Sequence, residues 1–116
     1  MLEGTTAADI ADVPLERTVC KLGGGAAVSF MDRSTVYDRE YYNAALCSGI
    51  PCQPKAAATG GNNAGAIHLS GKGVRTVAIS APCRYIHSAS SVADTDDINA
   101  VLKLAKYMLS YIATND

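Results

Sequence analysis

The pattern of apolar and polar positions predicts three strands along the chain. Residues 74–81 form the most apolar run and are rich in β-branched and small side chains, so we expect a buried strand that Pro82 ends. Shorter runs at 26–31 and 52–58 predict two more strands. Pro54 interrupts the second of these, which places that strand at an edge of the sheet or at a bulge.

Each predicted strand is followed by a helical pattern. The first helix is expected at about 38–47, where Asp38 is a suitable N-cap. A second, short helix is expected at 64–70, with Asn62 or Asn63 as its cap.

The third helix has the clearest signature. It begins after Asp94 or Thr95 and carries two further aspartates in its first turn, where the helix dipole favours negative charge. Seven apolar positions then follow helical spacing and form one stripe, which we expect to face the core. These positions are Ile98, Val101, Leu102, Ala105, Met108, Leu109 and Ile112.

Alternating strands and helices predict an α/β fold in three layers, with a largely parallel or mixed sheet flanked by helices. Parallel strands end at one edge of a sheet, so the polar segments 32–33, 60–63 and 84–88 are expected to converge there. Residues 2–9 resemble a loop that follows a strand, although no strand precedes them.

Composition narrows the class of protein. The chain has 116 residues and a net charge of -1, which allows one domain and argues against nucleic acid as a partner. No long apolar segment or signal peptide is recognisable, so we expect no membrane association and a cytoplasmic location. The four cysteines lack CxxC spacing, which favours reduced structural thiols over a zinc knuckle or disulfides.

Candidate chemistry centres on His87, which follows the most apolar strand. It could be a site residue or an ordinary loop histidine. Glu3, Asp9 and Asp32 are carboxylates that could join it at a metal. His68 lies on the short predicted helix and is interpreted as a packed or surface residue. Motifs for a nucleophile elbow, a phosphate loop or a dinucleotide fold are absent.

Several segments match one known family in the right order. They are Asp32–Ser34, Gly60–Ile67 and Val77–Ser88, together with Glu3–Asp9 near the start. These segments resemble the C-terminal part of the tetrahedral-type metallo-aminopeptidases, the glutamyl and deblocking enzymes, some of which are named cellulases or endoglucanases. The stretch Arg84-Tyr85-Ile86-His87-Ser88 is the most specific part of the resemblance.

The resemblance implies a zinc-peptidase-like fold and a two-metal site. In that family two zinc or cobalt ions share a bridging carboxylate and a water molecule, and a separate glutamate shuttles the proton. By resemblance, His87 is a ligand of one metal, and Glu3 stands at a carboxylate ligand of the other, usually an aspartate. Asn63, Gly61 and Arg84 are the implied substrate-binding residues; many members have aspartate where Asn63 stands.

The family's other metal ligands, its shuttle glutamate and its inserted smaller β domain have no counterpart here. Residues 1–116 are therefore expected to be one partial catalytic domain, without a catalytic residue of its own. We expect no tightly bound metal in this chain alone, peptides as substrates of the complete enzyme, and a homo-oligomer. The alternative is a stand-alone, non-catalytic α/β module that associates with itself.

Overall fold

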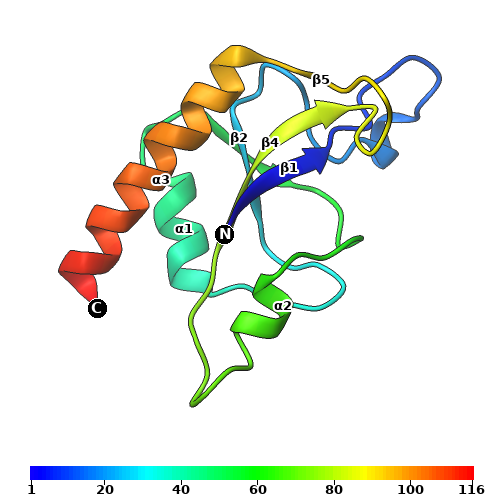
Figure 1. Ribbon diagram of the computed structural model, residues 1–116. Helices are drawn as coiled ribbons and strands as arrows, with labels where there is room; N and C mark the ends of the chain where they lie inside the picture. Colours follow the sequence, from blue (N-terminus) through cyan, green and yellow to red (C-terminus); the bar gives the residue numbers. More distant parts are fainter.

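Strand β4 (Ala78–Arg84) lies at the centre of a mixed five-stranded sheet. The computed structural model describes residues 1–116 (Figure 1). Parallel pairs join β1 (Leu2–Thr6) to β4 and β2 (Ala26–Ser29) to β3 (Cys52–Lys55). Antiparallel pairs join β4 to β2 and to the short β5 (Val92–Ala93), which gives the order β1-β4-β2-β3.

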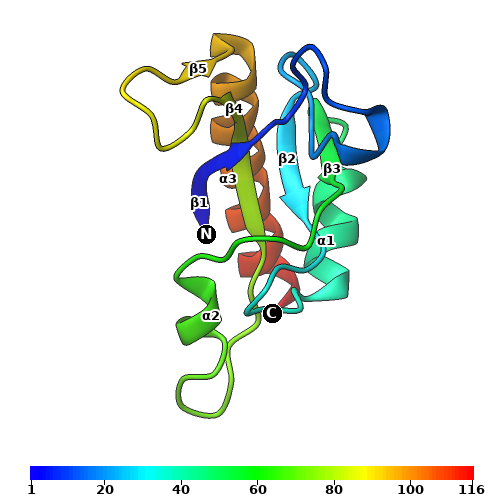
Figure 2. The ribbon, with the colours of Figure 1, turned by 90° about the vertical axis from the view of Figure 1, so that its right-hand side faces the viewer.

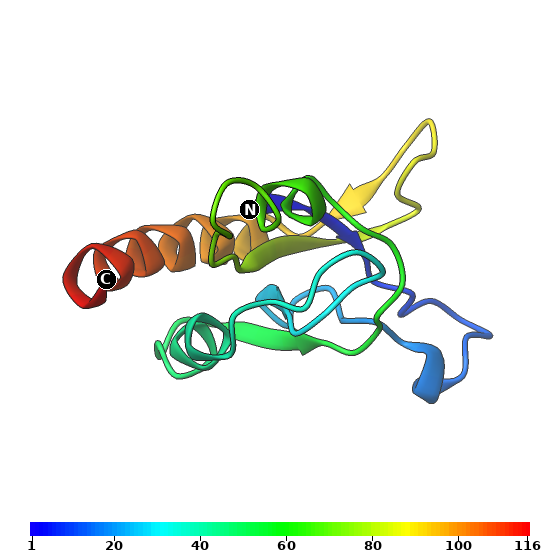
Figure 3. The ribbon, with the colours of Figure 1, turned by 90° about the horizontal axis from the view of Figure 1, so that it is seen from below.

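Both long helices lie on one face of this sheet. They are α1 (Arg39–Leu46) and α3 (Thr95–Asn115), which run side by side (Figure 3). Their apolar side chains cover β2 and β4 and form the main core. The opposite face carries the segment that leads from β3 to the short α2 (Ala64–Ile67) and crosses in front of β4 in Figure 2. A 3-10 turn (Leu15–Arg17) completes the elements, and none of the helices has the length and apolarity that membrane crossing requires.

The expected α/β fold with a mixed sheet flanked by helices is confirmed, and so is the edge position of β3. Asp38 caps α1 as predicted, because its Oδ1 accepts from the backbone N–H of Tyr41 at 3.0 Å. The interpretation of residues 2–9 as a loop is wrong for Leu2–Thr6, which pairs with β4 along its whole length. A strand this short and polar has no hydrophobic run to reveal it.

Pro82 does not end the apolar strand, contrary to the expectation. Strand β4 begins later, at Ala78, and continues through Pro82 to Arg84. The backbone N–H of Ile79 points toward β1, so by alternation the nitrogen of Pro82 points the other way. On that side β2 pairs only up to Ser80 and β5 only from Cys83, so Pro82 lies where no donor is needed.

The expected meeting of three strand ends at one edge rested on parallel strands, and that premise is wrong for β4. Because β4 runs antiparallel to β2, the loop after β4 leaves the sheet at the end opposite to the loop after β2. Residues 32–33 and 84–88 therefore lie at opposite ends of the sheet. Whatever brings these loops into one site must act across the face of the sheet.

A buried carboxylate fixes the glycine-rich turn before β2. Asp97 is 1% exposed, and its two oxygens accept from the backbone N–H groups of Gly23 and Gly25, each at 2.8 Å. Gly25 has φ +88°, and a Cβ there would stand 2.3 Å from the carbonyl of Pro51. The turn is therefore held against α3, and glycine is required at Gly25.

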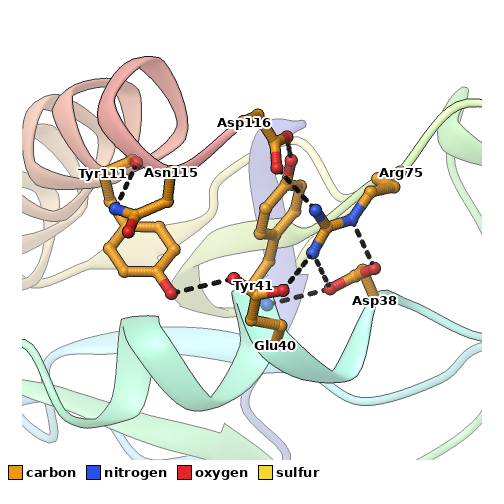
Figure 4. Close-up of polar contacts among 7 residues, drawn as sticks. All are labelled: Asp38, Glu40, Tyr41, Arg75, Tyr111, Asn115 and Asp116. Carbon is orange, nitrogen blue, oxygen red and sulfur yellow. Dashed lines mark hydrogen bonds and ion pairs between the residues drawn. The ribbon is translucent and has the colours of Figure 1, made fainter.

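Arg75 ties the beginning of α1 to the end of α3 (Figure 4). Its guanidinium donates to Asp38 and Glu40 at 2.7 Å and to Asp116 at 2.6 Å, and it lies 4.1 Å from the ring centre of Tyr41. Exposed pairs of this kind contribute little individually, but together they orient the two helices.

One flank of α3 leaves its apolar side chains in solvent. The Tyr111 hydroxyl donates to Glu40 on α1, so the flank that carries Ile98, Leu102 and Leu109 faces away from α1. The exposed fractions on this flank are 50% for Ile98, 53% for Leu102 and 70% for Leu109. The buried face consists of Asp97, Ala100, Leu104 and Met108. The predicted stripe is therefore confirmed only in part: Met108 is buried and Val101 and Ile112 pack against the core, but its remaining large apolar side chains are exposed.

The sheet also has an open edge, because β1 pairs only with β4 and Leu2 is 54% exposed. Open edges and apolar patches favour association. We therefore expect the chain to form a dimer or larger oligomer whose population rises with concentration. Light scattering coupled to gel filtration measures this directly.

The substitution Leu102→Lys should weaken that association by roughly tenfold or more, because a buried leucine contributes about 1.5–3 kcal/mol. Ser110→Lys, which adds the same charge to the polar flank of α3, is the matched control and should leave it unchanged. A single monomeric species at every concentration would contradict the expectation.

Candidate functional site

A hollow of about 440 Å³ lies on the face of the sheet that α1 and α3 leave open. Three parts of the chain surround it: strand β1, the segment that crosses from β3 to α2, and the loop after β4. The residues that line it include Glu3, Lys55, Gly61 and His87. The crossing segment, rather than parallel strand ends, brings Gly61 near the loop of His87.

Glu3 is placed by the register of β1 on β4. It pairs with Ser80, so its side chain points away from the helices, since the neighbouring pair of Leu2 and Ile79 faces the helical core. The Oε1 atom of Glu3 accepts from Nδ2 of Asn62 at 2.9 Å. Ser80 is fully buried below, and its hydroxyl has no hydrogen-bond partner.

Asn62 joins Glu3 to a buried chain of polar groups. Its Nδ2 also donates to the hydroxyl of Tyr37 at 2.8 Å, and its Oδ1 accepts from the backbone N–H of Ala64 at 2.8 Å. The Tyr37 hydroxyl in turn donates to Oδ2 of Asp32 at 2.5 Å. The result is a continuous path from Asp32, at one end of the sheet, to Glu3 in the hollow.

The negative charge of Asp32 determines which groups donate and which accept along this path. Burial raises the pKa of its carboxyl, but hydrogen bonds from Tyr37 and from Ser34 and Thr35 outweigh burial and hold the pKa below its ordinary value. Burial and the bond to Asp32 both raise the pKa of Tyr37. At neutral pH Asp32 is therefore an anion and Tyr37 a neutral donor.

Close packing under the crossing segment depends on glycine. A Cβ on Gly65 would stand 2.4 Å from the Oγ of Ser34, which the structure cannot accommodate without a shift. Gly60 has φ +78°, and its carbonyl accepts from the backbone N–H of Arg33 at 2.8 Å. Glycines at these positions let the segment lie directly on the loop of Asp32.

His87 lies in a loop of unusual backbone conformation. Its φ is +63° and that of Tyr85 is +58°, which places both in the left-handed region that residues other than glycine rarely adopt. The backbone N–H of Ser88 and the hydroxyl of Ser91 both donate to the Tyr85 carbonyl at 3.2 Å and stabilise the turn. Each such residue costs about 1–3 kcal/mol and is commonest at functional sites.

The structure places the other predicted site residues apart from the hollow. Arg84 donates through Nε to Asp9 at 2.8 Å, and this bond lowers the pKa of the Asp9 carboxyl. Asn63 is exposed beside α2 and does not line the hollow. His68 lies 2.8 Å from the Ala64 carbonyl through Nδ1, in keeping with a packed helix residue.

The donor chemistry of the hollow fits part of a metal centre. No group of three or more His, Cys, Asp or Glu side chains is gathered anywhere in the chain in a way that could hold a metal ion. Glu3 and His87 nevertheless line one hollow, and zinc and cobalt accept both carboxylate and imidazole ligands. They can fill two positions of a centre whose other ligands come from elsewhere.

Sequence reasoning missed the contributions of Tyr37 and Asn62. The sequence predicts Asn62 only as a possible helix cap and as part of the polar segment 60–63; its Oδ1 does accept from the Ala64 N–H, but neither pattern indicates its contact with Glu3. The pairing of Tyr37 with Asp32 depends on the hairpin that the bridge between Met31 and Val36 closes, and no spacing in the sequence signals it.

The lowered pKa of Asp32 predicts acid sensitivity. Its carboxylate stabilises the fold fully above the unfolded pKa, about 4, and this stabilisation is lost as pH falls through the lower folded pKa. Asp32→Asn should be less stable at neutral pH by roughly 1–3 kcal/mol, because the NH₂ group of the new amide would face groups that themselves donate hydrogen bonds. The variant should also lose less stability than the native chain on acidification. Asp9 and Asp38 also have lowered pKa values, but both proteins contain them, so their contribution to the pH dependence cancels in the comparison.

Urea denaturation between neutral pH and pH 3 measures both effects. Identical pH dependence in the native protein and in Asp32→Asn would contradict the assignment of charge to Asp32.

Comparisons with known proteins agree on one family. A model of the M42 glutamyl aminopeptidase family matches residues 1–104. A putative aminopeptidase of Acetivibrio thermocellus is 39% identical over 88 residues, which are 72% of this chain and 27% of that protein. The chain thus spans about a quarter of the length of this relative.

Solved structures of peptidases share the fold. Aminopeptidase APDkam598 from Desulfurococcus kamchatkensis superposes with a TM-score of 0.87 at 28% identity, over 91% of this chain and 32% of that one. The Pyrococcus horikoshii TET1 peptidase, described as assembling into a tetrahedron or a large octahedral shell, shares the fold with a TM-score of 0.66 at 24% identity, over 92% of this chain and 32% of its own. The chain therefore belongs to the M42 glutamyl aminopeptidase family.

Proposed function

We propose that these 116 residues form part of a two-metal aminopeptidase that removes N-terminal residues from peptides. The observation that carries the proposal is that Glu3 and His87, from distant parts of the sequence, line one hollow. Glu3 would be a ligand of one zinc or cobalt ion and His87 a ligand of the other. The aminopeptidase named in Acetivibrio thermocellus supports the reaction class.

Bound divalent ions in such a centre lower the pKa of water and polarise a peptide carbonyl. The residues of this chain would bind the metal ions and orient the groups that hold them. Glu3 presents a carboxylate that Asn62 holds by one oxygen, and His87 presents an imidazole from a loop that hydrogen bonds to Tyr85 fix. Of the three substrate-binding residues that the resemblance implies, we assign a substrate contact only to Gly61, because Asn63 and Arg84 do not line the hollow.

The proposal includes the assembly of copies. TET peptidases form large oligomers, as the Pyrococcus horikoshii TET1 peptidase does. The uncovered flank of α3 and the open edge of β1 also support a second candidate function, a non-catalytic α/β module that associates with itself. The two candidates are distinguished by metal binding at Glu3 and His87, which only the first candidate requires.

Metal binding can be measured in the native chain with Mn²⁺, which broadens nuclear magnetic resonances even when binding is weak. We expect Mn²⁺ to broaden the signals of Glu3, Gly61 and His87 before others. His87→Ala should abolish this selectivity. His68→Ala is the matched control, because His68 is the only other histidine and lies outside the hollow.

Uniform broadening across the chain, or broadening that persists in His87→Ala, would remove the metal assignment.

The isolated chain should lack aminopeptidase activity, because it offers two ligands and no group placed as the hydrolytic base. We expect no release of nitroaniline from aminoacyl nitroanilides with zinc or cobalt added. Turnover that co-purifies with the chain and disappears in His87→Ala would show this to be wrong. Turnover that survives His87→Ala would mark a contaminating peptidase.

A further inference from the structure

We propose that Asn62 is a positioning residue that fixes one oxygen of Glu3 and leaves the other to the metal. Tyr37 and Asp32 orient Asn62 for this role. The inference rests on the proposed function, since it concerns how Glu3 is presented. It adds a residue that would touch neither metal nor substrate.

The orientation of the Asn62 amide is determined by its partners. Its Oδ1 faces the N–H of Ala64, a donor, and its Nδ2 faces Glu3 and the Tyr37 hydroxyl. A flipped amide would set donor against donor at Ala64 and oxygen against the carboxylate of Glu3. Only one orientation satisfies all three contacts.

Tyr37 acts as an acceptor toward Asn62 because its single proton is already used. That proton goes to Asp32, which is 5% exposed and accepts further bonds from the Ser34 and Thr35 backbone. Tyr37 is itself 2% exposed, so its side chain has no room to turn away. The direction of donation therefore runs from Asn62 to Tyr37 to Asp32 on one side, and from Asn62 to Glu3 on the other.

The consequence for Glu3 is that its two oxygens become unequal. Oε1 is held by Asn62, and no protein hydrogen bond reaches Oε2. The geometry thus favours binding of a metal through Oε2 alone, because binding through both oxygens would break the contact with Asn62. Anchoring one oxygen also reduces the rotamer freedom that a glutamate loses when it binds.

The test compares Asn62→Leu with Asn63→Leu. Leucine at position 62 is similar in shape but cannot donate, whereas Asn63 is an exposed neighbour without a side-chain hydrogen bond. The first readout needs no metal: side-chain couplings should show Glu3 in one rotamer in the native chain and in Asn63→Leu, but averaged in Asn62→Leu.

The second readout is the Mn²⁺ concentration that half-broadens the His87 resonance. It should rise by roughly tenfold in Asn62→Leu, the effect expected from losing a hydrogen bond to a charged group. Asn63→Leu should leave it unchanged.

The outcomes separate the two proposals. Selective Mn²⁺ broadening in the native chain with an unchanged midpoint and a single Glu3 rotamer in Asn62→Leu would overturn the role of Asn62 alone. An absence of selective broadening in the native chain would overturn the proposed function, while the rotamer measurement still decides whether Asn62 orients Glu3. If Asn62→Leu fails to fold, the native chain remains decisive: Asn62 amide protons that exchange as fast as those of Asn63 would contradict the proposal.

Discussion

A carboxylate inside a protein must be surrounded by donors, and the way Asp32 meets this requirement shapes the open face of the sheet. Four groups donate to it: two backbone N–H groups, the Ser34 hydroxyl and the Tyr37 hydroxyl. Satisfying Asp32 commits the proton of Tyr37, which in turn makes Tyr37 an acceptor for Asn62. The crossing segment is thereby fixed above the sheet, and the hollow forms between that segment, β1 and the loop of His87.

The sequence predicted the fold class, α1 and its cap, the edge position of β3 and the identity of the family. These features depend on local patterns: a capping aspartate, a proline in a short strand, and motifs that lie in order along the chain. The antiparallel course of β4 could not be predicted in this way, because strand direction depends on which strands pair. The expected convergence of loops was wrong for the same reason.

Helix α3 shows a second limit of pattern reasoning. Its sequence carries an apolar stripe from Ile98 to Ile112, yet the chain buries a neighbouring face that includes the charged Asp97. Asp97 is tolerated there because Gly23 and Gly25 donate to both of its oxygens, an arrangement that only the folded turn provides. Of the candidate site, Glu3, Gly61 and His87 are brought together, whereas Tyr37 and Asn62 emerge only from the three-dimensional structure.

The most direct test of the central claim, that Glu3 and His87 serve one metal centre, is an anomalous diffraction measurement on crystals grown with cobalt. The account predicts a cobalt peak in the hollow, at a coordinating distance of about 2.0–2.2 Å from Oε2 of Glu3 or from the imidazole of His87. Cobalt bound only at His68 or at the aspartates of α3, with none in the hollow, would contradict it.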